Sequence, residues 1–372
     1  MNYLNLKYNL IFFFISFIYV STKYFFSIIE FPNENFILKI MRFSDLEYAY
    51  LVESFSRFDF STDWSYFEKS KNIIGFPIFS IIFHAIAFKA FGYYSFYILE
   101  IIFFFLIICI FFKILIKLEK DVLKSLNGIL ILLVICQFIE FGKFYDPGLF
   151  AKFNPVTEFI GLRFPRPLVT SVFALIFLIN LMNITDKKFI ECKNNIYFIS
   201  LSLALLVNSF FHLFFIFFVL AILYLIPKLL NEGLVDLNNK TKIIFNSSLI
   251  ILVGISVFFI QQSLSEIDYS NRIGVHYLNL SDKLKNSIDF LKIYTKAEYI
   301  LLFLICLSLK LYFNLKKKKD IYNKYLSIFW LFIISSFISP LIFIFLSNKV
   351  IVSHHFLTII KFSLFLFVFI SF

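Results

Sequence analysis

The chain has 372 residues, of which 60% are hydrophobic and 16% are charged, and its formal net charge is +11. A soluble domain averages about 45–50% apolar and about 25% charged residues, so the composition excludes an ordinary soluble protein. Apolar runs such as "IIFFFLIICIFF" (101–112) lack the alternation of polar and apolar residues that membrane β-barrels show. The sequence therefore predicts an all-α, polytopic membrane protein.

The positive charge does not indicate a nucleic-acid partner. Thirty of the 35 basic residues are lysines, and they stand mostly at the ends of apolar segments. The positive-inside rule predicts this distribution for loops on the cytoplasmic side of a membrane. The partner that the composition indicates is the lipid bilayer.

The four cysteines indicate neither a disulfide framework nor a zinc site. Cys109, Cys136 and Cys306 lie inside apolar segments, and Cys192 lies alone in a short loop. The paired C-x-x-C spacing of zinc and redox sites is absent.

Ten apolar segments are long enough, or nearly so, to cross a hydrocarbon core, and they predict about 9–11 transmembrane helices. The first lacks a small-residue cleavage site and is expected to be a retained anchor. We expect a single domain over 1–372, with a long acidic external loop at 31–72 and a later external loop at 263–297. The ten segments are 9–29, 73–91, 95–117, 126–140, 167–184, 196–226, 243–262, 298–314, 325–346 and 356–372.

Segment 196–226 is too long for one straight crossing, since about 20 residues span a bilayer. It contains the polar run "VNSFFH" (207–212). Two helices that meet at a polar break explain both features, because non-helical backbone at membrane depth is tolerated where it lines a cavity. His212 is expected either to face a substrate or to make a helix–helix hydrogen bond.

Four short lysine-dense loops predict the orientation. If segment 196–226 crosses twice, all four lie on one side, which is the cytoplasmic side. All five arginines then lie on the external side. The loops are 112–124, 186–193, 227–242 and 316–320.

Segment 73–91 does not fit this alternation. The 31–72 loop is expected to be external, and segment 95–117 must also begin on the external side to place its lysines inside. Segment 73–91 therefore begins and ends on the same side and cannot be a full crossing. The "GFP" at 75–77 and Lys89 also make it a poor span. We expect it to be re-entrant or packed along the external face, the alternative being an external N-terminus.

The stretch "GLRFPRPLVT" (161–170) predicts an anion site. Pro167 suits the first turn of the apolar helix that follows, and helix N-termini favour anions. Arg163 and Arg166 add planar donor groups that match phosphate. The alternatives are ion pairs with Glu158 or Asp146, or contacts with lipid headgroups.

The 31–72 loop carries the candidate catalytic carboxylates, Asp45 and Glu47. On an extended segment the two point the same way, whereas on a helix they diverge. A carboxylate here can act as a general base for an acceptor hydroxyl, with Asp45 the stronger candidate. The acids can instead hold Mg²⁺ or Mn²⁺, or belong to a solvated loop.

Two further segments carry histidines on the predicted external side. Arg272 and His276 would share one face if "NRIGVHYLNLSD" (271–282) were helical, and this segment is expected to cover the site or to form an ordinary surface loop. His354 and His355 are adjacent and would point apart on a helix, so no metal site is assigned to them.

An ordered series of features occupies the first 140 residues. An N-terminal span precedes an external loop with "SDLEYAY" (44–50), then "GFPIFSIIFHAIAFKAFG" (75–92), then a long apolar helix. This order resembles the integral-membrane glycosyltransferases of the C-type superfold. The resemblance implies a polyprenyl phosphate or pyrophosphate sugar donor and catalysis on the external face, and it matches Asp45 to the family's catalytic acid.

These features predict transfer of a sugar from a polyprenyl-linked donor to a glycan or lipid acceptor. The alternatives are a polysaccharide polymerase or ligase that uses the same donor, and a transporter or flippase, which needs repeats and a midplane site. Abundant Phe, Ile and Lys with little Arg is typical of an AT-rich genome and so indicates a bacterial inner membrane. The expected substrate contacts are Arg163, Arg166, His212, Arg272 and His276.

Overall fold

The computed structural model of the chain describes most of its helices and leaves several connecting segments undescribed. The described residues are 2–30, 46–61, 78–119, 121–145, 160–162, 167–233, 236–264, 276–277, 279–315, 320–346, 349–350 and 353–371.

The protein is an all-α membrane protein, as its composition predicts. Apart from the short 3₁₀ helix η2 (Ile190–Cys192) and two strands of two residues each, β1 (His276–Tyr277) and β2 (Lys349–Val350), the elements are α-helices. The helices are α1 (Asn2–Glu30), α3 (Leu46–Ser56), α4 (Phe79–Phe91), α5 (Tyr94–Glu119), α6 (Val122–Tyr145), α9 (Leu168–Ile184), α10 (Lys193–Val207), α11 (Phe211–Asn231), α12 (Leu237–Leu264), α14 (Leu280–Tyr294), α15 (Ala297–Leu315), α16 (Asp320–Leu346) and α17 (Ser353–Ser371).

Among the described residues, six helical stretches are long and apolar enough to cross a membrane, and five shorter apolar helices accompany them. The described parts of all ten apolar segments predicted from the sequence are mainly helical, with 196–226 divided between α10 and α11. The six stretches are Tyr94–Glu119, Ile190–Val207, Phe211–Asn231, Leu237–Gln261, Ala297–Leu315 and Tyr322–Leu346.

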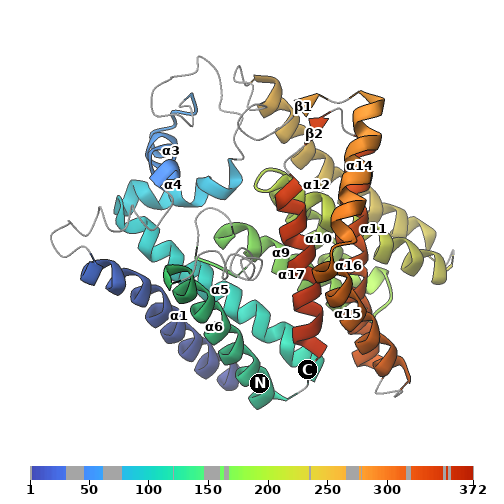
Figure 1. Ribbon diagram of the computed structural model, residues 1–372, viewed down its shortest axis with the longest axis horizontal. Helices are drawn as coiled ribbons and strands as arrows, with labels where there is room; N and C mark the ends of the chain where they lie inside the picture. The colour runs from blue at the N-terminus through green and yellow to red at the C-terminus, as the bar shows by residue number, and fades with distance from the viewer. Residues whose placement is uncertain are drawn as a thin grey trace.

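The long helix α5 organises the N-terminal half of the bundle. It packs against α1, α4, α6 and α9, and in Figure 1 it crosses the molecule between the blue N-terminal helices and the green central ones. Its buried face is almost entirely phenylalanine, isoleucine and leucine. Helix α9 is buried on nearly all sides, so α5 and α9 together form the centre of the apolar core.

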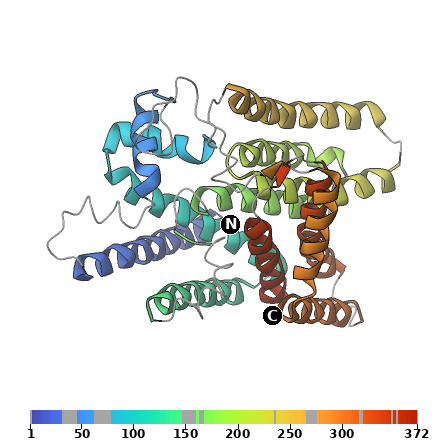
Figure 2. The same ribbon diagram turned by 45° about the horizontal axis from the view of Figure 1, so that its top comes forward.

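Helices α9 to α12 run back and forth beside one another (Figures 1 and 2). Helix α10 packs on both α9 and α12, and Figure 2 shows α12 along one edge of the molecule. The chain reverses at residues 208–210, between α10 and α11. The polar break predicted within 196–226 is therefore confirmed.

Lysine-bearing segments meet at one end of the bundle, which we call the lysine end. Tyr325, near the start of α16, donates a hydrogen bond to Asp186 in the α9–α10 loop (3.0 Å). Lys324 pairs with the same carboxylate at 3.9 Å. Lys117, near the end of α5, lies 5.8 Å from the Tyr325 ring centre. The end of α5, the α9–α10 loop and the start of α16 thus share one end, as the lysines near them predict.

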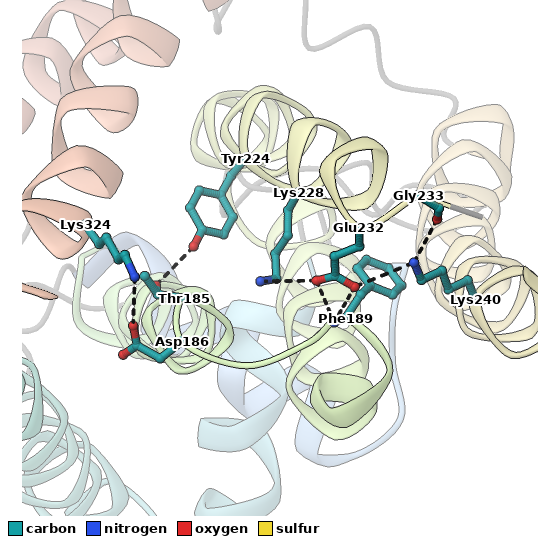
Figure 3. A network of polar contacts seen from close by, with 9 residues as sticks. All are labelled: Thr185, Asp186, Phe189, Tyr224, Lys228, Glu232, Gly233, Lys240 and Lys324. Carbon is teal, nitrogen blue, oxygen red and sulfur yellow. Dashed lines mark hydrogen bonds and ion pairs between the residues drawn. The ribbon is translucent and has the colours of Figure 1, made fainter. Parts of the chain in front are cut away.

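Glu232 joins the α11–α12 connection to the same end (Figure 3). Both of its carboxylate oxygens accept from the Phe189 N–H, at 2.9 and 3.0 Å. Lys228 and Lys240 lie 3.5 and 3.6 Å from the carboxylate. The ends of α9 and α11 and the start of α12 are therefore tied together by one carboxylate.

Helix α4 is too short to cross a hydrocarbon core by itself. It has 13 residues and is about 20 Å long, which is shorter than a hydrocarbon core of about 30 Å. It packs on α3 and on the start of α5, and its first residue, Phe79, donates a backbone hydrogen bond to Asn208 O in the α10–α11 turn (3.2 Å). The structure describes residues 78–91 of this segment, whose helix packs on α3 and α5. Whether the segment is re-entrant or packed along the external face stays a prediction.

Candidate functional site

The turn between α10 and α11 carries the polar side chains that define the candidate site. We call Asn208, Ser209, Phe210, His212 and His355 the break cluster. Asn208 ends α10 and ties the turn to two helices, because its side-chain N–H donates to Gly254 O of α12 (2.8 Å) and to Ala204 O of α10 (3.1 Å). The turn is therefore anchored, and its polar groups have fixed positions.

His212 and His355 meet across this turn. His212 stands in the first turn of α11 and His355 in the first turn of α17, and their ring centres are 5.0 Å apart. Phe210 lies 5.3 Å from each of the two rings, and Phe356 lies 4.8 Å from His212. Two imidazoles with donor and acceptor nitrogens are thus held together inside an aromatic surround.

The break cluster lies beside a stretch long and apolar enough to span a membrane and not beyond its end, because Asn208 is bonded to Gly254 within Leu237–Gln261 of α12. The stretch of α12 from Lys240, at the lysine end, to Gly254, beside Asn208, is about 21 Å long. Helix α12 continues beyond Gly254 to Leu264, for about 15 Å more. Polar groups at such depth are expensive and usually face a cavity or a partner that uses them.

Two buried polar atoms of the cluster make no hydrogen bond with any described residue. They are Asn208 Oδ1 and Ser209 Oγ, in side chains whose residues are 1% and 0% exposed. A buried group left unsatisfied costs about 1–3 kcal/mol. In native proteins such groups usually serve water, an ion or a ligand. The cluster therefore has hydrogen-bonding capacity for a bound polar group.

Ser209→Ala is expected to raise the free energy of unfolding of the ligand-free protein by up to about 1 kcal/mol, because it removes an unsatisfied buried hydroxyl. Ser336→Ala is the matched control. The Ser336 hydroxyl donates to Ile333 O (2.7 Å) and bonds to Ser363 Oγ (2.9 Å), so its loss is expected to destabilise by about 1 kcal/mol. Thermal unfolding in detergent compares the two, and equal destabilisation would contradict this account of Ser209.

The condition under which Arg272 and His276 would share a helical face is not met at His276. Residue 276 lies in strand β1, where it pairs with Val350 of β2 in antiparallel register, so it does not share a helical face with Arg272. Arg272 itself lies outside the described residues. His276 is extended because its backbone pairs with β2, and this pairing holds residues 276–277 beside the residues just before α17. The backbone at His276 is thereby placed near the helix that carries His355, in keeping with a segment that covers the site.

The helix that follows the arginine pair begins as predicted. Pro167 is the N-cap of α9, and the Ser171 N–H donates to Pro167 O at 2.8 Å. The first turn of the helix is fully inside the protein, with Leu168 and Val169 at 0% exposure. Arg163 and Arg166 lie outside the described residues.

The carboxylates of the first loop fall into two groups. Asp45 lies outside the described residues. Glu47 lies on α3, which begins at Leu46. The extended conformation that would point the two carboxylates the same way is therefore not present at residues 46 and 47. The other group has structural partners. Glu53 accepts from Tyr93 OH (2.9 Å) and pairs with Arg57, and Asp59 accepts from Ser61 N–H and Oγ–H.

No group of three or more His, Cys, Asp or Glu side chains that could hold a metal ion occurs in the described part of the chain. Asp45 and the other acids of residues 31–45 and 62–77 lie outside the described residues. The expectation of Mg²⁺ or Mn²⁺ at the first loop therefore stays a prediction.

The His212–His355 pair was not predicted from the sequence. The two residues are far apart in the chain, and each was considered alone. The only available signal was that both begin an apolar helix directly after a polar turn, "NSFFH" and "SHH". Helices that begin at the same end of a bundle place such residues side by side, so the signal needed the bundle order to be useful.

Comparison with known proteins adds no relative to this description. No family model, no curated protein and no solved structure matches the chain. The functional conclusion therefore depends on the chemistry of the site.

Proposed function

We propose that the protein is a membrane glycosyltransferase that takes a sugar from a polyprenyl-phosphate donor at the end of the bundle opposite the lysine end. The observation that carries the proposal is the break cluster, with two imidazoles and two unsatisfied buried oxygens at membrane depth. A lipid-linked phosphate is a polar group that must be bound at that depth. The proposed location is the inner membrane of a bacterium, with this end external.

The phosphate would be bound by cations and donors from several helix starts. Arg163 and Arg166, before α9, supply guanidinium groups that match phosphate oxygens. His212 and His355 supply imidazole N–H donors, and the N-terminus of α11 supplies a partial positive charge. His276, whose strand pairs with the residues before α17, and Arg272, earlier in the same segment, are further candidate contacts. Ionised donors stabilise the leaving phosphate as negative charge develops on it.

The reaction needs one base and one leaving group. The acceptor hydroxyl of a glycan or lipid attacks C1 of the sugar, and its proton passes to the Asp45 carboxylate, with Glu47 as the second candidate. The bond from C1 to the phosphate oxygen breaks, and its electron pair leaves with the polyprenyl phosphate. A polymerase or ligase that uses the same donor would need the same phosphate contacts.

Transport is the less favoured function. Transporter sites typically use discontinuous helices whose two halves continue in one direction near the membrane midplane. Here the start of α10 and the end of α11 are both at the lysine end, where the Phe189 N–H bonds to Glu232. The break is thus the turn of a helical hairpin, which suits a site open to one side.

Binding of a polyprenyl phosphate to the purified protein in detergent tests the proposal. Arg163→Ala/Arg166→Ala is expected to weaken binding by about 100-fold, because each guanidinium–phosphate contact contributes about 1.5–3 kcal/mol. Asp45→Asn is expected to bind as the wild type does and to lose sugar transfer. Arg57→Ala is the control, since Arg57 pairs with Glu53 within α3.

Three results would contradict the proposal. The first is a wild-type protein that binds no polyprenyl phosphate. The second is equal binding by the wild type and the double arginine variant, which would make "RFPRP" a structural helix entry. The third is uptake of a lipid-linked sugar into vesicles by Asp45→Asn at the wild-type rate, which would favour a flippase.

A further inference from the structure

Helix α3 ends in a turn that normally requires glycine. The Asp59 N–H donates to Ser54 O and the Phe58 N–H to Phe55 O, each at 3.0 Å. This pair of bonds is the Schellman motif, in which the residue at the position of Phe58 adopts the left-handed conformation, usually as glycine. Phe58 has φ 61°, a conformation that side chains with a Cβ rarely adopt.

The strained Phe58 does not contribute its ring to the core. The residue is 73% exposed, and Lys89 Nζ of α4 lies 5.2 Å from its ring centre. Strain held at an exposed residue indicates that the side chain serves something outside the protein. A phenyl ring beside an ammonium group pairs an apolar contact with a cation.

Phe58 continues an apolar surface on α4. Helix α4 exposes Ile86 (67%), and Phe91 (54%) and Tyr94 (51%) follow at its C-terminal end. Phe83 (37%) lies at the edge of this exposed side, where its ring also packs on Phe103 of α5 and Phe173 of α9. The opposite side of α4 buries Ser80, Ile81, His84 and Ala85. We call Phe58, Phe83, Ile86, Lys89 and Phe91 the α4 surface.

The α4 surface lies at the level of the bilayer leaflet on the side opposite the lysine end. At one end α4 is bonded to Asn208 in the break, which is at membrane depth. At the other end it turns at Gly92, with φ 56°, into α5, which is long and apolar enough to span. Its exposed side is therefore continuous with the lipid-facing side of a membrane helix.

We propose that the α4 surface is a binding site for a phospholipid of this leaflet. The acyl chain lies along Phe83, Ile86 and Phe91, and the headgroup phosphate is held by Lys89 beside the Phe58 ring. Aromatic and lysine side chains together are typical of the membrane–water interface, where the apolar part enters the lipid and the ammonium reaches the phosphate. The inference does not depend on the proposed glycosyltransferase activity.

Quenching of a tryptophan reporter by brominated lipid tests the site. The chain has two tryptophans, so Trp64→Phe/Trp330→Phe is the background, and Phe58→Trp and Ile86→Trp are the reporters. The protein is placed in vesicles of phosphatidylcholine brominated in the acyl chain. Leu252→Trp, on the exposed side of α12, is the lipid-facing control, and Glu191→Trp, exposed at the lysine end, is the water-facing control.

Both reporters are expected to be quenched to about the level of Leu252→Trp. Lys89→Glu is expected to reduce the quenching of Phe58→Trp, because a carboxylate repels the phosphate. Quenching by aqueous acrylamide at the level of Glu191→Trp would overturn the proposal, since the surface would then face water. Protection from both quenchers would also overturn it, because a second copy or another protein would then cover the surface.

Discussion

Gly254→Ala is expected to lower the free energy of unfolding by about 2 kcal/mol, although alanine is the better helix former by about 1 kcal/mol. A Cβ at position 254 of α12 would lie 2.7 Å from both Cα and Cβ of Ala204 in α10. Backbone atoms cannot rotate away, so the two helices must separate. The same shift lengthens the hydrogen bond that the Asn208 side-chain N–H donates to Gly254 O. Unfolding of the purified protein in detergent measures the loss.

Gly128 in α6 provides the matched control. A Cβ there would meet only Leu115 Cδ1, at 3.0 Å, and a leucine side chain can move. Gly128→Ala is therefore expected to stay within about 1 kcal/mol of the wild type. Equal losses at both positions would show that α10 and α12 do not approach as closely as described. Because Gly254 supports the break, its alanine variant is also expected to bind polyprenyl phosphate more weakly.

The membrane helices were predictable because each requires a long, nearly uncharged run. The break within 196–226 was predictable for a related reason, since a polar "NSFFH" cannot remain in a straight span without a partner. The shared end of the lysine-bearing loops followed from charge alone. The features that could be predicted are thus those that the bilayer imposes locally on the sequence.

The features that could not be predicted depend on distant contacts. Helix α14 has a polar sequence, and it is held by packing on α16, with Tyr294 OH donating to Phe337 O (3.1 Å) and Lys283 Nζ lying 3.3 Å from Phe345 O. The pairing of β1 with β2 joins segments that no local pattern relates. The meeting of His212 and His355 depends on the order of the helices in the bundle.

The two ends of the bundle differ in how their polar groups are satisfied. At the lysine end, Glu232 accepts from the Phe189 N–H and pairs with Lys228 of α11 and Lys240 of α12. Asp186 accepts from Tyr325 and pairs with Lys324, both of α16, so the charges there serve to hold the bundle together. At the other end, the break cluster keeps Asn208 Oδ1 and Ser209 Oγ without a described partner. Charged side chains therefore hold the lysine end together, whereas two buried oxygens of the break cluster keep hydrogen-bonding capacity. Asn323 Oδ1, near the start of α16, is a further buried oxygen without a partner among the described residues.

Glu232→Ala is expected to lower the free energy of unfolding by about 2–3 kcal/mol, because it leaves the ammonium group of Lys240 buried without a counter-charge. The Lys240 side chain is 3% exposed and that of Glu232 is 22% exposed, so the loss is smaller than for a fully buried pair. Lys240 would keep only its hydrogen bond to Gly233 O (3.0 Å). Asp289→Asn is the control. Its pair with Lys292 has side chains 50% and 72% exposed, and removing it is expected to change stability by at most about 0.5 kcal/mol.

The double variant Glu232→Ala/Lys240→Met distinguishes a stranded charge from a lost packing contact. Replacing the ammonium by an apolar group of similar length removes the buried charge, so the double variant is expected to recover at least half of the stability that Glu232→Ala loses. The cycle consists of the wild type, Glu232→Ala, Lys240→Met and the double variant. Thermal or detergent unfolding of these four proteins gives the coupling energy between the two side chains. Additive losses would contradict the role assigned to the pair, and the Phe189 N–H contact would then account for the effect of Glu232. A positive coupling would show that the lysine end is held together by this carboxylate, independently of any ligand at the break cluster.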